Sequence, residues 1–413
     1  MNPPERPQIA FWFRYGPGAH AELLHCLSDI IEGLARNCIV HYYCPTSSKP
    51  IPERIKNNVQ LHILPFTINR SSTADKIIKT LFWLLLMPLM AIHCRLKKID
   101  AVYIDETLPL STGLARIFFG RKVAVTITDF FLNIYGIKMP GLRPFCQAIN
   151  MLDMVAWRKL PLIFTRAKST RDYLTSSGVP SERIFPVYDP CDTTIYRPID
   201  KQACRQKFGY STDDIVLVHH GILHPNKGND RIIEELHSLL DECPNLRFLL
   251  IGDGPEMPRL RQLVKTKKLE NIVTFTGWLS KLSDVNCALN AGDIGLVMRA
   301  GLDTDHYAMT GALIHNMACA LPVLAARLRS IEEVIQDGQN GFLFDPENMN
   351  EFKTKLITLA NNPNLRQEFG KKVIAVVREQ FDMQKVAQQT IEPLLRLCIG
   401  KDGLVTSTAP TSE

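Results

Sequence analysis

Short apolar runs along the chain alternate with longer stretches in which apolar residues recur at helical spacing. Residues 294–298 form one such run, a polar loop covers 299–306, and apolar residues then fall three or four positions apart up to Ala318. A second apolar run follows at 322–326. This order predicts a strand, a loop, a helix and a second strand, which is the repeating unit of a parallel α/β sheet.

The same alternation opens the chain. Residues 8–13 predict a strand, a loop containing Gly18 follows, and residues 19–35 and 38–44 predict a helix and a second strand. Strand, glycine loop and helix are typical of a nucleotide-binding fold, although the dinucleotide spacing GxGxxG is absent. Gly18 is therefore a candidate ligand-binding residue, and the alternative is an ordinary turn glycine.

The pattern is repeated on both sides of a turn-rich stretch at 189–198, which predicts two Rossmann-like domains. We expect the first domain to span residues 1–195 and the second to span residues 196–380. A helix predicted at 381–400 is expected to pack back on the first domain. Residues 401–413 show no periodicity and are expected to form a disordered tail.

Several polar residues stand directly after predicted strands, where an open α/β sheet places its ligand cleft. In the first domain these are Thr128 and Asp129. In the second domain the glycine-rich loop 221–228 ends with Lys227 before a predicted helix. An ammonium group at that place can neutralise a phosphate, and the alternative is a solvated lysine.

The helix predicted after residue 309 begins with Thr310 and Gly311. Threonine is a common N-cap residue, and glycine lets a ligand approach the backbone. Amides at a helix start suit a phosphate or diphosphate. The preceding loop carries Asp305 and His306. The alternative is an ordinary βαβ unit with a solvated loop.

Residues 77–92 predict the most apolar helix, because twelve consecutive residues from Leu81 to Ile92 are apolar. The stretch is shorter than the ~20 residues that span a bilayer. Basic residues flank it: Lys76, Lys79, Arg95, Lys97 and Lys98. Two interpretations remain open, a helix that lies in a membrane interface and a helix buried against the sheet.

Composition narrows the classes of function. The 413 residues are 46% hydrophobic and 22% charged, which suffices for two cores, and the net charge is +6. This charge is too dilute to indicate nucleic acid, whereas an anionic substrate or an acidic membrane surface would fit. The eleven cysteines form no Cys-x-x-Cys pair, and Met1 to Pro7 is polar, so we expect reduced thiols, no signal peptide and a cytoplasmic location.

Several motifs of the second half occur in the order found in a known family. They include IGDGP at 251–255, VTFTGW at 273–278, and Met317-Ala-Cys with Pro322-Val323. On these motifs the chain resembles the retaining nucleotide-sugar glycosyltransferases of glycosyltransferase family 4, which have the GT-B fold. The resemblance implies two Rossmann-like domains facing across a cleft and a hexosyltransferase acting without a metal or other cofactor. The implied partners are a nucleotide-sugar donor and a glycan or lipid-linked acceptor, at the inner face of a membrane.

The resemblance also implies roles for individual residues. Lys227, Asp305 and His306 would be catalytic, and Thr128 and Asp129 would lie on the acceptor side. A further set of residues would bind the diphosphate, ribose or base of the nucleotide-sugar, or would shape the loops beside it. They are Gly18, Gly221, Lys227, Trp278, Leu279, Met309, Thr310, Gly311 and His315.

The chain departs from the family pattern at several positions. Ile222 stands where an arginine is usual, Tyr307 and His315 replace two glutamates, and Thr128 replaces a histidine. These departures leave two alternatives to an active transferase. One is a non-catalytic homologue that binds a nucleotide-sugar or a partner enzyme. The other is a different GT-B enzyme, such as a sugar-nucleotide epimerase, which the order of the motifs disfavours.

Overall fold

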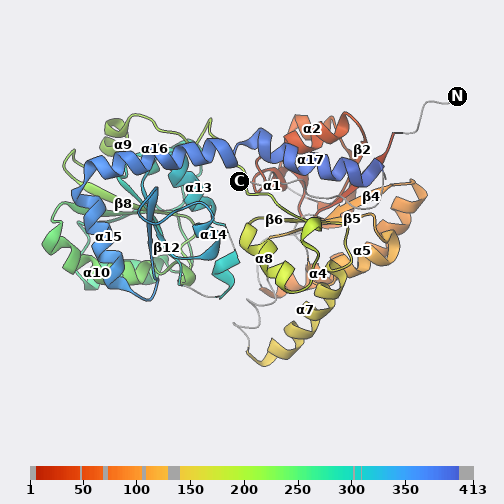
Figure 1. Cartoon of the computed structure of the whole chain (residues 1–413), viewed down its shortest axis with the longest axis horizontal. Helices are drawn as coiled ribbons and strands as arrows, with labels where there is room; N and C mark the ends of the chain where they lie inside the picture. Colours follow the sequence, from red (N-terminus) through yellow and green to blue (C-terminus); the bar gives the residue numbers. More distant parts are fainter. Residues whose placement is uncertain are drawn as a thin grey trace. The chain divides into compact units, whose positions relative to one another are not determined.

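The computed structural model describes residues 6–46, 49–67, 73–104, 108–128, 140–300, 303–307 and 309–399. The chain divides into two compact units, each built around one sheet (Figure 1). Unit 1 comprises Met1–Pro190 and Met383–Glu413, and unit 2 comprises Cys191–Asp382.

The sheet of unit 1 has seven parallel strands in the order β3-β2-β1-β4-β5-β6-β7. Helices cover both of its faces, so the central strands are buried at every position instead of at alternate positions. The strands are β1 Gln8–Trp12, β2 Ile39–Thr46, β3 Gln60–Thr67, β4 Ala101–Ile104, β5 Val123–Ile127, β6 Leu162–Thr165 and β7 Ile184–Pro186.

The helices around this sheet are α1 Pro17–Ala21, α2 Leu27–Ala35, α3 Glu53–Lys56, α4 Thr73–Leu96, α5 Ser111–Phe119, α7 Arg143–Trp157, α8 Lys168–Ser176 and α17 Met383–Ile399. The single helix predicted at 19–35 was wrong, because the chain turns between α1 and α2. Apolar residues spaced along α17, among them Val386, Ile391 and Leu394, join the core of unit 1 beside α2. The last helix therefore belongs to the first unit.

The sheet of unit 2 has six parallel strands in the order β10-β9-β8-β11-β12-β13. The strands are β8 Ile215–His220, β9 Leu246–Ile251, β10 Val273–Phe275, β11 Ile294–Val297, β12 Val323–Ala326 and β13 Gly341–Phe344. The helices are α9 Lys201–Phe208, α10 Asn229–Glu242, α11 Met257–Thr266, α12 Leu282–Asn290, α13 Gly311–Ala318, α14 Arg329–Glu332, α15 Met349–Asn361 and α16 Pro363–Gln380.

Strand order in unit 2 reverses between β8 and β11. The chain runs outward from β8 to β9 and β10, then returns to place β11 on the other side of β8. Loops that leave β8 and β11 therefore diverge, and sheets of this kind bind ligands outside the carboxyl ends of the two strands. The two sheets together give the α/β architecture that the sequence predicts.

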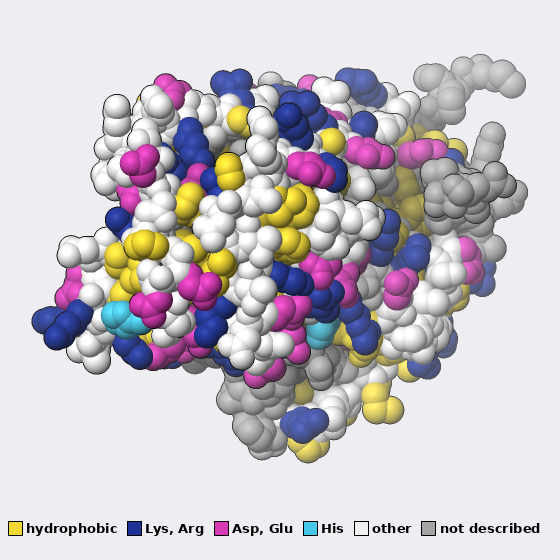
Figure 2. All heavy atoms as spheres, turned by 60° about the vertical axis from the view of Figure 1, so that its left-hand side comes forward, with side chains coloured by type: hydrophobic (Ala, Val, Ile, Leu, Met, Phe, Trp, Pro, Cys, Tyr) yellow, Lys and Arg dark blue, Asp and Glu magenta, His cyan; other side chains and the backbone are white. Residues whose placement is uncertain are grey.

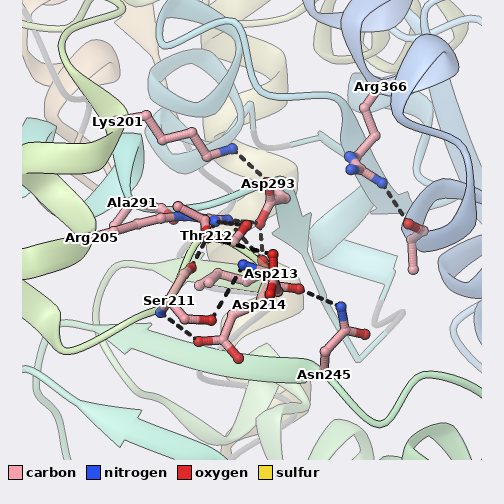
Figure 3. A network of polar contacts seen from close by, with 12 residues as sticks. Lys201, Arg205, Ser211, Thr212, Asp213, Asp214, Asn245, Ala291, Asp293 and Arg366 are labelled. Carbon is pink, nitrogen blue, oxygen red and sulfur yellow. Dashed lines mark hydrogen bonds and ion pairs between the residues drawn. The ribbon is translucent and has the colours of Figure 1, made fainter.

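A buried polar network holds the opposite, amino-terminal ends of the same strands (Figure 3). The Asp293 carboxylate accepts bonds from the Arg205 guanidinium and, at 2.7 Å, from the Val216 amide. Arg205 also donates to the carbonyls of Thr212 and Asp214, each at 2.9 Å. Because both charged groups are buried and fully engaged, α9 and the first residues of β8 and β11 are tied together.

On unit 2, many charged residues lie beside residues of opposite charge. On the face drawn in Figure 2, Lys and Arg side chains lie next to Asp and Glu side chains over unit 2. Examples are Lys355 with Asp337 at 2.8 Å and Arg231 with Glu347 at 2.9 Å. The Arg231–Glu347 pair is exposed, and exposed pairs contribute little to stability, ~0–1 kcal/mol each.

Helix α4 has two different faces. Trp83, Met87 and Met90 are buried against unit 1, whereas Leu85 and Leu89 are 72% and 63% exposed. The helix is longer than the predicted 77–92. Its buried face agrees with the interpretation of a helix packed inside the domain, and the membrane-interface interpretation stays a prediction. Among the described residues, we find no helix with the length and hydropathy required to traverse a bilayer.

Candidate functional site

Two loops meet at the point where the strand order of unit 2 reverses. The loop after β8 and the loop after β11 are joined by a bond from the Ala300 amide to the Asn226 carbonyl, 2.8 Å long. Gly228 has a φ of +60°, and a Cβ there would come within 3.0 Å of Met298. Glycine is therefore required at this position by both backbone conformation and space.

Lys227 lies at this junction. It ends a short 3-10 turn, Pro225–Lys227, directly before α10, and its side chain is half-buried. Burial and then repulsion by Arg299 lower the pKa of the Lys227 ammonium to about 7, while Asp305 acts in the opposite direction. An anion bound here would relieve the repulsion between the two cations, so the junction favours a phosphate group.

Arg299 was not among the residues that the sequence singled out. It follows β11 closely, and its guanidinium lies 3.3 Å from the carboxylate of Asp305. The Asn226 side-chain amide donates to the same carboxylate oxygen at 3.4 Å. A basic residue just after a buried strand was the available signal, but the position of β11 beside β8 was needed to interpret it.

The start of α13 faces the same end of the sheet. Met309 and Thr310 are buried and Gly311 is exposed. Thr310 occupies the N-cap position, but its hydroxyl makes no capping bond to the first turn. Among the described residues, a Cβ at Gly311 would meet only the His315 ring, at 3.7 Å, which is an ordinary contact. Packing of the described residues therefore does not require a glycine here.

His315, one turn further along α13, is held in a column of rings. The Tyr196 ring stacks on it with a centroid distance of 3.8 Å and an interplanar angle of 9°, and the His220 ring lies 5.3 Å away. Burial and the Lys227 charge lower the pKa of His220 to about 4, and burial raises the pKa of Tyr196 to about 12. Both rings are therefore uncharged near pH 7, and they orient His315 without adding charge.

The remaining candidates in unit 2 lie around this centre. The Arg329 amide donates to His306 at 3.4 Å, which places His306 against α14. Gly221 has a φ of +128° and turns the chain sharply out of β8. Trp278, 71% exposed, and the half-buried Leu279 follow the edge strand β10, which β9 separates from β8. Lys227 and Asp305 thus lie close together at the strand reversal, and Trp278 lies further along the carboxyl-terminal edge of the same sheet.

The candidates in unit 1 have distinct environments. Gly18 lies in α1, where a Cβ would come within 2.1 Å of the Pro50 carbonyl oxygen, so close packing explains this glycine. The hydroxyl of Thr128, which follows β5, is buried and has no hydrogen-bond partner in the described part of the chain. Asp129 lies outside the described residues.

Comparisons with known proteins give the family and the fold that this chain resembles. Residues 214–362 match the family model described as glycosyl transferases group 1. The N-acetyl-alpha-D-glucosaminyl L-malate synthase of Bacillus anthracis is 24% identical over 302 residues, which are 73% of this chain and 75% of that protein.

Two solved structures have the same fold over nearly their whole length. Anabaena HepE in complex with UDP is 19% identical with a TM-score of 0.68, and the match covers 94% of this chain and 99% of that one. Sucrose-phosphate synthase from Thermosynechococcus elongatus is 16% identical with a TM-score of 0.71, and the match covers 95% of this chain and 99% of that one.

Proposed function

We propose that this chain, whose second unit matches group 1 glycosyltransferases and whose two sheets form the GT-B fold, is a glycosyltransferase that uses a nucleotide-sugar donor. The sugar is transferred to a glycan or lipid-linked acceptor with retention of the anomeric configuration. The observation that carries the proposal is the junction of the two loops after β8 and β11, which the 2.8 Å bond from the Ala300 amide to the Asn226 carbonyl joins and which brings Lys227 and Arg299 to the strand reversal of unit 2. A site with two cations near a helix start suits a nucleoside diphosphate leaving group.

The proposed chemistry follows from the leaving group. Negative charge develops on the β-phosphate as the sugar departs, and the Lys227 ammonium with the amides of α13 would stabilise it without a metal. The acceptor hydroxyl would lose its proton to an oxygen of the leaving phosphate. Because this route uses no protein base, Thr128 in place of a histidine is compatible with it. Retention is expected from the family resemblance.

Different residues of unit 2 would bind different parts of the donor. We assign the diphosphate to Lys227, Met309, Thr310 and Gly311, with Gly221 shaping the loop. His315, oriented by the Tyr196 ring, would hydrogen-bond the ribose hydroxyls where a carboxylate is usual.

Other parts of the donor and acceptor are assigned by position. Trp278 and Leu279 would frame the base, and His306 would contact the sugar. In unit 1, Thr128 stays our candidate for the acceptor side, with Asp129 and Gly18 as further proposals. The UDP and UDP-glucose complexes of Anabaena HepE support a uridine donor.

An anionic membrane surface is the proposed location of the acceptor. Helix α5 packs between α4 and α7 in unit 1 (Figure 1). These three helices expose large apolar side chains, which we call the α4–α7 apolar surface. Its members are Ile78, Leu81, Phe82, Leu85, Leu89, Ile92, Leu96, Ile117, Phe145, Met151, Leu152 and Val155.

The net charge of the segment that carries this surface fits an acidic bilayer. Residues 73–160 carry twelve Lys and Arg and six Asp and Glu, so their net charge of +6 equals that of the whole chain. Exposed apolar side chains in a basic segment are typical of proteins that bind the cytoplasmic face of anionic membranes. We therefore propose a cytoplasmic, peripheral membrane protein.

A non-catalytic homologue is the second candidate. The observation that favours it is the replacement of both usual glutamates, by Tyr307 and His315. Such a protein would keep the nucleotide site and lose transfer.

The two candidates are separated by measuring binding and transfer on the same protein. A ligand that binds only the native state raises the melting temperature, so UDP, GDP and ADP are compared first and the matching nucleotide-sugars are then assayed for transfer and hydrolysis. An active enzyme is stabilised by one diphosphate and consumes the corresponding donor. Stabilisation without consumption would support the non-catalytic homologue, and the absence of stabilisation by any nucleotide would refute both.

A further inference from the structure

We propose that Arg299 is a second diphosphate-binding cation and that Asp305 is the counter-ion which Arg299 exchanges for the donor phosphates. This inference rests on the proposed function and assigns the regulation of that same site. It also gives Asp305 a positioning role through Arg299, in place of the catalytic role that the resemblance implied.

The placement of Arg299 supports a role toward a ligand. Its side chain is 14% exposed and comes from the loop after β11, on the opposite side of the strand reversal from Lys227. The two cations thus approach the same place from two adjacent strands. By contrast, Ile222, at the position where the resembling family has an arginine, is 57% exposed and apolar. The second cation is therefore supplied from β11 instead of from the loop after β8.

The charges of the described side chains at this place are unequal. Arg299 and Asp305 are the described charged groups that act on Lys227, one repelling and one attracting it. Among these three groups, two cations face one carboxylate when Lys227 is protonated, in a region that is largely shielded from water. An anion that displaces Asp305 from this place must carry more than one negative charge to neutralise both cations. A diphosphate meets that requirement, and a single carboxylate does not.

The contacts of Asp305 with these groups suit an exchange. Asp305 is 4% exposed, yet its distances to Arg299 and Asn226 are 3.3 and 3.4 Å, longer than the 2.7–3.2 Å of typical bonds. Phosphate oxygens form shorter, charge-assisted and often bidentate bonds to a guanidinium. Donor phosphates should therefore displace the carboxylate from Arg299, while Asn226 remains available to hold the released Asp305.

The consequence is a competition between Asp305 and the donor for one guanidinium. Removal of the Arg299 charge should weaken diphosphate binding. Removal of the Asp305 charge should strengthen it, because the internal competitor is lost. A merely structural ion pair would behave differently, since loss of either partner would disturb the loop and weaken binding.

The test measures the dissociation constants of UDP, UMP and inorganic pyrophosphate by calorimetry on the full-length protein. Arg299→Met should weaken UDP and pyrophosphate binding by about tenfold or more and change UMP binding less. Arg299→Lys should restore part of the loss. Asp305→Asn should tighten UDP binding severalfold. Arg259→Met removes an exposed arginine that pairs with Asp230 between α10 and α11, and should leave all three constants unchanged.

The outcomes separate this inference from the proposed function. Weaker UDP binding by Asp305→Asn, or unchanged UDP and pyrophosphate binding by Arg299→Met, would overturn the exchange. If wild type binds UDP and the variants shift its affinity as described, the exchange is supported whether or not transfer is detected. If wild type binds no nucleotide but binds pyrophosphate with the same variant pattern, the proposed donor fails and the cation pair stands. Melting temperatures without ligand establish that each variant is folded, and a misfolded Arg299→Met is replaced by Arg299→Gln.

Discussion

Lys227 shows how one side chain can combine a loop position, burial and a neighbouring charge. Its place before α10 is a local property, and it could be predicted from the glycine-rich loop 221–228. The lowered pKa of Lys227 is not a local property, because it is caused by burial in the fold and by repulsion from Arg299, which is distant in sequence. In the unfolded chain the group would have an ordinary lysine pKa, so the folded protein disfavours the charged form between about pH 7 and that value.

The first prediction concerns the pH dependence of nucleotide binding. Bound phosphates favour the charged Lys227, so binding above pH 7 must take up a proton, and binding below pH 7 need not. The dissociation constant of UDP should therefore rise above pH 7 by up to roughly tenfold per pH unit. Calorimetry between pH 6 and 9 measures it. Lys227→Arg is the control, because arginine stays charged and the dissociation constant of this variant should change little with pH. If wild type and Lys227→Arg show the same pH dependence, Lys227 does not bind the phosphates.

The second prediction concerns Gly311. Gly311→Val should fold, because the nearest atoms to a new Cβ belong to His315 at 3.7 Å. It should nevertheless lose transfer and diphosphate binding, because the side chain would occupy the space of the phosphates at the helix start. Thr310→Ser should be mild, since the Thr310 hydroxyl makes no capping bond. Donor consumption and UDP affinity measure both variants, and a fully active Gly311→Val would move the diphosphate elsewhere.

At the scale of elements, β8 and β11 have different roles at their two ends. Their amino ends are tied by Asp293 and Arg205, and their carboxyl ends carry the loops with Lys227 and Arg299. A rigid attachment at one end allows the loops at the other to keep a fixed spacing. The Arg205–Asp293 network is thus a structural support of the site and does not contact it.

The third prediction tests that support. Asp293→Ala leaves the buried Arg205 without its carboxylate and should lower the free energy of unfolding by about 3–5 kcal/mol. Urea denaturation followed by circular dichroism measures the change. Asp284→Ala is the matched control, because its pair with Lys207 is more exposed and should contribute little to stability. Equal losses in the two variants would contradict the structural role of the network.

At the scale of the whole molecule, charge is divided unequally between the units. On the face drawn in Figure 2, unit 2 carries side chains of both signs, whereas residues 73–160 of unit 1 carry a net charge of +6, equal to that of the whole chain. The α4–α7 apolar surface lies in the same segment. We therefore propose that unit 1 contacts the membrane and that unit 2 binds the nucleotide.

The fourth prediction concerns this separation. In a flotation assay, liposomes containing phosphatidylglycerol should recover the wild-type protein, and liposomes of phosphatidylcholine alone should recover much less of it. Leu85→Gln with Leu89→Gln should reduce recovery, and loss of the five charges at Lys76, Lys79, Arg95, Lys97 and Lys98 should remove the lipid preference. Leu23→Gln, an exposed apolar position outside the surface, should have no effect. Equal recovery of all variants would leave the exposed face of α4 without a membrane role.

The sequence by itself determined the order of the elements and the α/β class. Apolar periodicity along 8–44 and 294–326 is a local property that the backbone converts directly into strands and helices. The loop of Lys227 and the helix start at Thr310 and Gly311 could be predicted for the same reason. The break between α1 and α2 could not, because packing of the intervening turn overrides helical spacing.

Only the tertiary structure decided which of these pieces meet. Lys227 and Arg299 are 72 positions apart, and they approach because β11 returns to the side of β8. Tyr196 stacks on His315 across an even longer separation. The exposed face of α4 depends likewise on which side of the helix the sheet covers. Strand order and packing arise from contacts between distant residues, and periodicity, which records only near neighbours, carries no information about them.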